Sequence, residues 1–190
     1  MDIHELRNTV DSFGKAMKII EEKANSDADL EEPARAEIAF LGLYLIFDDG
    51  SFDEEELKAV EEASGFKINR DHWNEIMELG RVNSEESYLS QPPNTFMVMV
   101  DIDNTLYEAG EEMTAYVAAY EVYKLFGEFF VNIKGFTDEK RQAKLVRFIE
   151  VIEKYRQENS KGPVVKPRTD IDADGRVIPS KKGVEAPKKS

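Results

Sequence analysis

The stretch VMVDIDNTLY, residues 98–107, holds the residues whose types and spacing are best suited to chemistry. Asp101 and Asp103 are separated by one residue, and Thr105 follows at the same interval. Carboxylates can bind a hard cation such as Mg²⁺, and one of them can act as a nucleophile. That chemistry requires residues 98–100 to form a buried strand that carries both carboxylates at its end. If the same residues form a helix that runs into a turn, the stretch predicts packing instead.

As a strand, the stretch resembles the nucleophile motif of the haloacid-dehalogenase phosphatases. The resemblance implies that Asp101 is the nucleophile, that Asp103 is the general acid, and that both help to hold a magnesium ion. That fold needs several further parallel strands, whereas helical patterns both precede and follow the motif. A small magnesium phosphohydrolase is therefore the alternative hypothesis, and its structural context is missing from the sequence.

Other chemistry-bearing residues are scarce. The chain has no cysteine, which excludes disulfide scaffolds, thiolate zinc sites and cysteine nucleophiles, and its two histidines are His4 and His72. No apolar run approaches the ~20 residues that span a bilayer, and the N-terminus lacks the basic start and apolar centre of a signal peptide. We therefore expect a cytoplasmic protein with no membrane partner.

Charge divides the chain into two parts. Residues 1–160 hold 17 Lys and Arg against 35 Asp and Glu, a net charge of −18, whereas residues 161–190 hold eight against four, a net charge of +4. The acidic body should repel nucleic acid. The tail contains four prolines and few large apolar residues, so we expect a disordered linker or docking segment. Its candidate partner-binding residues are Lys181, Lys182, Lys188 and Lys189.

Hydrophobic spacing predicts an all-α body of about seven helices. From Ile3 to Ile20 the apolar residues recur every three or four positions, which indicates an N-terminal helix over residues 2–24. The next helix, with Pro33 in its first turn, is apolar nearly all round and should lie at the centre. Asp53 is a good N-cap, with Glu56 placed for a capping box, and Gly65 ends that helix. We expect further helices around Trp73, after Pro93, from about Met113, and from Thr137 to Tyr155.

Two segments of the body align with each other. Residues 43–52, LYLIFDDGSF, match residues 97–106, MVMVDIDNTL, so that Asp49 meets Asp103 and Gly50 meets Asn104. Asn tolerates positive φ better than other non-glycine residues, so Asn104 is predicted to end a helix as Gly50 does. Acidic residues follow in both copies, where a helix dipole favours them. The sequence thus predicts an internal helix-turn-helix pseudo-repeat.

This repeat of helix, Asp-Gly or Asp-Asn turn and acid-started helix resembles the TerB-like (tellurite-resistance TerB) family. The resemblance covers roughly residues 34–155. This part of the chain is also similar to the TerB-like regions found beside or fused to bacterial AAA-type ATPases. It implies an all-helical bundle in which the acidic turn residues bind a divalent cation, Ca²⁺ or Mg²⁺. The matching positions here are Asp49 and Asp103.

These observations predict one helical domain over residues 1–160, with its core in 34–155, and a basic tail over 161–190. The function that they favour is a non-enzymatic adaptor that binds a protein partner, such as an AAA-type ATPase, and carries a weak cation site. A stress-response metal sensor differs from this adaptor only in whether cation binding changes its shape. The phosphohydrolase with Asp101 and Asp103 stays the enzymatic alternative.

Overall fold

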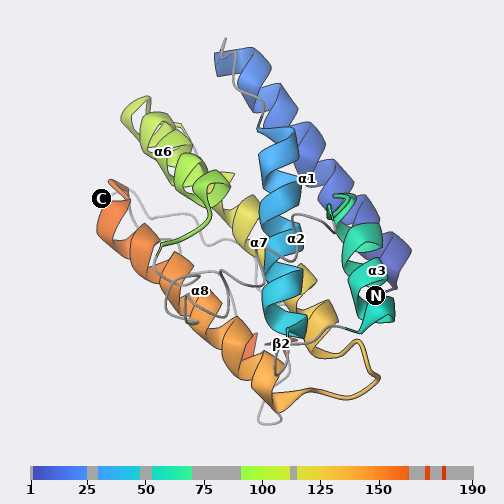
Figure 1. Cartoon of the computed structure of the whole chain (residues 1–190). Coiled ribbons are helices and arrows are strands. Elements are labelled where there is room, and N and C mark those ends of the chain that lie inside the picture. Colours follow the sequence, from blue (N-terminus) through green and yellow to red (C-terminus); the bar gives the residue numbers. More distant parts are fainter. Residues whose placement is uncertain are drawn as a thin grey trace.

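The structure, a computed structural model, describes residues 2–24, 30–47, 53–69, 91–111 and 115–162, together with the backbone of 170–171 and 177–178. Its body is all-helical, as the sequence predicts (Figure 1). The expected helix around Trp73 lies outside the described residues. The helices of the described residues are α1 (Ile3–Ala24), α2 (Glu31–Ile46), α3 (Glu54–Ser64), α6 (Asn94–Glu108), α7 (Ala115–Val131) and α8 (Glu139–Asn159).

Helix α2 occupies the centre of the bundle. It contacts α1 and α3 on one side, α7 behind, and α6 and α8 on the other side, as Figure 1 shows. Its buried residues lie on every face of the helix, which confirms the position predicted from its apolar composition. Gly42 lies where α2 is squeezed between two neighbours, because a Cβ there would be 2.9 Å from Val60 of α3 and 3.0 Å from Phe126 of α7.

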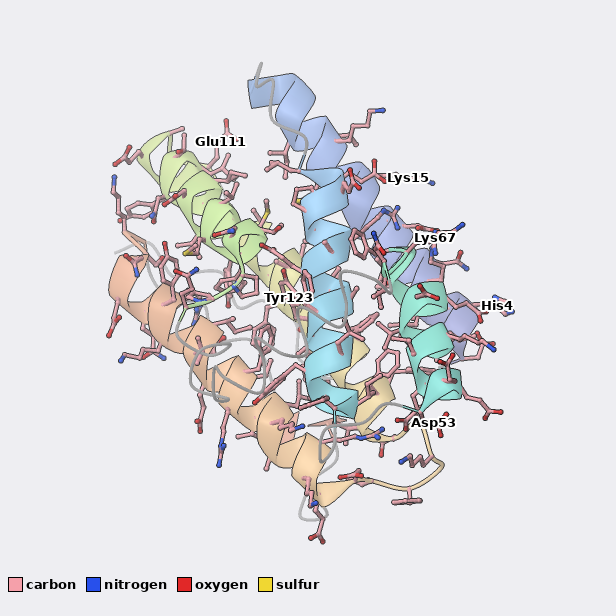
Figure 2. All side chains as sticks on the ribbon, viewed as in Figure 1. His4, Lys15, Asp53, Lys67, Glu111 and Tyr123 are labelled. Carbon is pink, nitrogen blue, oxygen red and sulfur yellow. The ribbon has the colours of Figure 1, made fainter. Side chains whose placement is uncertain are left out.

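Aromatic and aliphatic side chains from each of the described helices form one core. The ring of Tyr123 on α7 is fully buried beside Phe148 of α8, at a centroid distance of 5.5 Å. Its hydroxyl donates to Glu37 of α2 across 3.3 Å, and Figure 2 shows it at the middle of the bundle. The hydrophobic effect therefore assembles the helices, while the polar groups buried with the core must find partners inside it.

Several predicted helix ends are confirmed and others are corrected. Asp53 is the N-cap of α3 and accepts the N–H of Glu55, and Gly65 ends this helix at φ +70°. Glu56 does not complete a capping box, because its side chain turns inward to another helix. Helix α8 begins after Asp138, one residue beyond the predicted Thr137.

Beyond Gly162, the tail is described at two short segments. Asp170–Ile171 (β1) and Val177–Ile178 (β2) pair as antiparallel two-residue strands, with Asp170 opposite Ile178. The predicted disorder of the rest of the tail falls on residues outside the described part. No helix within the described residues is long and apolar enough to cross a membrane.

Candidate functional site

The stretch VMVDIDNTLY, residues 98–107, lies inside one continuous helix. Helix α6 runs from Asn94 to Glu108, so residues 97–100 are neither a strand nor the end of a helix. The strand that phosphatase chemistry would need at this motif is therefore absent. The predicted helix stop at Asn104 is also wrong, because the chain turns at Gly110, whose φ is +77°.

The same result corrects the alignment of the two segments. Helix α2 ends at Ile46, which aligns with Val100, but α6 continues eight residues past Val100. The two copies therefore end their helices at different aligned positions. The turn residues of the first copy, Asp49 and Gly50, lie outside the described residues, so the predicted repeat is not confirmed.

Asp101 and Asp103 lie in different environments. They are two residues apart on a helix, which places their side chains about 200° apart around its axis. Asp101 is exposed, whereas Asp103 is only 2% exposed. A nucleophile and a general acid that act on one phosphate must face the same substrate, so this arrangement does not suit the shared role that the phosphatase resemblance implies.

Asp103 caps a neighbouring helix. Its Oδ1 accepts the N–H of Ala115 and its Oδ2 accepts the N–H of Tyr116, both at 2.9 Å. These N–H groups begin α7, where the helix dipole is positive and the backbone donors have no partner within the helix. The side chain of an interior residue of α6 thus does what an N-cap residue of α7 would ordinarily do.

The surroundings of Asp103 differ from those expected of a cation ligand. Asp103 faces two N–H donors at the positive end of α7, an arrangement that favours an anion. Within the described residues, no group of three or more carboxylate or histidine side chains gathers as metal ligands would. Asp49, the other predicted ligand, lies outside these residues, so the pairing of Asp49 with Asp103 stays a prediction.

The next residue, Asn104, binds the opposite end of a different helix. Its Nδ2 donates to the carbonyl oxygen of Asn159 at 2.9 Å, and its Oδ1 accepts the N–H of Lys161 at 2.7 Å. Both partners lie at the C-terminal end of α8. Asp103 and Asn104 are 2% and 8% exposed, and together they fix the start of α7 and the end of α8 to the C-terminal half of α6.

A tyrosine and arginine cluster borders Asp103 on the α7–α8 side. The guanidinium of Arg156 lies over the ring of Tyr116, 4.3 Å from its centroid, and its Nη2 donates to Glu153 at 3.0 Å. Burial raises the pKa of both Tyr116 and Tyr120 to about 12, although the positive charge of Arg156 partly opposes this. These hydroxyls are therefore uncharged at neutral pH and unsuited to act as bases.

Other charged residues cap helices in the same manner. The carboxylate of Glu37 on α2 accepts the N–H groups of Asn94 and Thr95, the first two residues of α6, at 2.8 and 3.0 Å. Lys144 of α8 donates to the carbonyl oxygens of Tyr44 and Phe47 at the end of α2. Carboxylates thus lie at the starts of helices and a lysine ammonium lies at the end of a helix, as the helix dipole favours.

One buried ion pair was not predicted from the sequence. Nη2 of Arg141, 1% exposed, lies 2.9 and 3.0 Å from the two carboxylate oxygens of Glu56 on α3. Lys134 approaches the same carboxylate at 3.4 Å from the loop before α8. The signal was the position of Arg141 on the apolar stripe of α8, since Leu145, Phe148 and Ile152 follow it at helical spacing.

One apolar cavity accompanies these polar sites. It has a volume of about 120 Å³ and lies between α2 and residues 66–69, which follow α3.

The predicted partner-binding residues Lys181, Lys182, Lys188 and Lys189 lie outside the described part of the chain. Comparison with known protein-family models, curated proteins and solved structures found no match to this chain.

Proposed function

We propose that this chain is a non-enzymatic, TerB-like binding or assembly module that engages a protein partner. The observation that carries the proposal is the use of Asp103, the acid best placed for chemistry, as a helix cap with both oxygens occupied by backbone N–H groups. Glu37 and Glu56 likewise hold helices together. The acidic groups of the interior therefore support the bundle, and the outer surface and tail are left to bind.

The charge of the two parts indicates the chemistry of the partner. The tail, at +4, complements an acidic protein surface, while the body, at −18, repels nucleic acid. The family resemblance suggests an AAA-type ATPase or another component of the same assembly. A tail of 30 residues also acts as a tether that raises the local concentration of the domain at a bound partner.

Affinity purification from the native cell tests this proposal. The intact chain is compared with a chain that ends at Ser160 and with a full-length variant in which Lys181, Lys182, Lys188 and Lys189 are replaced by serine. We expect a protein partner that the intact chain retains, that the truncated chain loses, and that the serine variant holds more weakly and with less sensitivity to salt. Retention of the same partner by all three chains would contradict a docking role for the tail.

The enzymatic alternative has its own measurement. Purified protein is assayed for hydrolysis of a chromogenic phosphate with magnesium and with a chelator. We expect no activity above the buffer blank. Magnesium-dependent hydrolysis that Asp101→Asn abolishes, in a variant that keeps the helical circular dichroism spectrum, would overturn the proposal in favour of a phosphohydrolase.

A further inference from the structure

The end of α8 is bound to α6 through both backbone and side chain. Asn104 accepts the N–H of Lys161 at 2.7 Å and donates to the carbonyl of Asn159 at 2.9 Å. The ammonium of Lys161 lies 2.6 Å from Oε1 of Glu108, one helical turn further along α6. Asn104 is 8% exposed, so water competes poorly for its two hydrogen bonds.

The two kinds of contact differ in strength. The Lys161–Glu108 pair is open to solvent, with both side chains about 60% exposed, and such pairs contribute little. The buried amide of Asn104 supplies two directional hydrogen bonds. This one side chain binds a carbonyl and an N–H at the end of α8 that have no partner within the helix. Asn104 is therefore the residue on which the position of Lys161 chiefly depends.

We infer that Asn104 fixes the point at which the basic tail leaves the bundle, so that residues 159–161 belong to the domain and the segment offered to a partner begins at Gly162. This inference rests on the proposed role of the tail and gives its geometry. It places the root of the tail beside the C-terminal half of α6, where Figure 1 shows α6 and α8 side by side. A chain that ends at Ser160 also loses the N–H that Asn104 accepts. A second truncation that ends at Gly162 keeps this contact and removes only the segment beyond it.

We call the contacts of Asn104 and Glu108 with residues 159–161 the clamp. Limited digestion with trypsin measures how firmly the clamp holds Lys161, and it needs no partner. Trypsin must take the Lys161 side chain into its own pocket, which requires release of both contacts. The bond after Arg168 is the reference within the same chain, and the bond after Lys144, inside α8, reports global unfolding. In Asn104→Ala we expect the rate of cleavage after Lys161, relative to Arg168, to rise roughly tenfold, the factor expected from losing one or two neutral hydrogen bonds.

Matched variants separate the two contacts. Glu108→Gln should raise the relative rate by less than about threefold, because the pair is exposed. Thr105→Ala, on the same helix, should leave it unchanged, since the Thr105 hydroxyl donates only to Asp101 of its own helix. Asn104→Asp keeps an acceptor for Lys161 but loses the donor to Asn159, and an intermediate rate is expected.

An unchanged ratio in Asn104→Ala would overturn the inference. A rise matched by equal cleavage after Lys144 would report loss of the fold, and Asn104→Asp then provides the decision, because it can fold and still raise cleavage after Lys161 alone. A folded Asn104→Asp variant with an unchanged ratio would overturn the inference. The outcome is independent of the proposed function. Tail-dependent capture of a partner can fail while the clamp is confirmed, and the clamp can fail while capture persists.

Discussion

Asp103 and Asn104 show how two adjacent polar residues can serve two different helices. Because successive residues of a helix point about 100° apart, Asp103 reaches the start of α7 while Asn104 reaches the end of α8. Each supplies what its target lacks, an acceptor for free N–H groups and an amide for a free carbonyl and N–H. The short motif that resembles a catalytic sequence is thus a junction between three helices.

The capping role predicts the response to substitution of Asp103. Asp103→Ala removes two charge-assisted hydrogen bonds from buried N–H groups, and we expect the free energy of unfolding to fall by about 2–3 kcal/mol. Urea denaturation measures it. Asp101→Asn is the matched control, because Asp101 is exposed on the same helix, and it should change stability by less than about 0.5 kcal/mol.

The same variants test the cation site. If Asp103 acts only as a cap, the loss in Asp103→Ala is equal in chelator and in millimolar Ca²⁺ or Mg²⁺, and neither cation raises the melting temperature of the parent protein. A parent protein that melts higher with cation, through an increment that Asp103→Ala abolishes, would instead support the cation site expected from the family resemblance.

Helices were predicted far better than their ends. The apolar spacing of α1 and the all-round apolar character of α2 are properties of the segments themselves, and both helices were predicted from them. The ends of α6 and α7 depend on Glu37 and Asp103, which lie on other helices, so no local pattern contains them. An Asp-Asn pair indicates a helix stop when considered alone, yet this pair lies within a helix because its partners belong to other segments.

Helix α7 gives a prediction for the dependence of stability on pH. Tyr116 and Tyr120 have a pKa of about 12 in the folded protein, against about 10 for an unfolded tyrosine. Above pH 10 the unfolded chain releases these protons before the folded protein does, so the stabilisation is complete below pH 10 and is lost as pH rises toward 12. We expect the urea midpoint to fall over this interval.

Ultraviolet absorbance of tyrosinate gives an independent measurement, in which Tyr116 and Tyr120 of the folded chain ionise only near pH 12. Tyr116→Phe and Tyr120→Phe should each reduce the slope of stability against pH. Tyr107→Phe is the control, because this side chain is 45% exposed. A slope that neither buried substitution changes would show that other groups cause the alkaline transition.

The buried pair of Glu56 and Arg141 joins α3 to α8. Glu56 lies in the first turn of α3 and Arg141 lies near the start of α8, and Arg141 also reaches the carbonyl of Phe130 at the end of α7, at 3.3 Å. Burying two charges is costly, and their attraction and hydrogen bonds only offset that cost. Such a pair therefore adds little net stability compared with apolar residues. Removing one partner, however, strongly lowers the free energy of unfolding, because the other charge stays buried.

We therefore expect the stability effects of substitutions at Glu56 and Arg141 to be strongly coupled. Glu56→Leu leaves the Arg141 guanidinium buried without the Glu56 carboxylate. Arg141→Met leaves the buried Glu56 carboxylate with Lys134, 45% exposed, in place of Arg141. Each should therefore lower the free energy of unfolding by about 3–5 kcal/mol in urea titrations. The double variant replaces the pair by apolar groups and should recover most of that loss. Lys154→Ala, which breaks an exposed pair with Glu158, should cost less than about 0.5 kcal/mol. Losses that simply add in the double variant would mean that the pair is not what holds α3 to α8, because coupled residues cannot behave as independent ones.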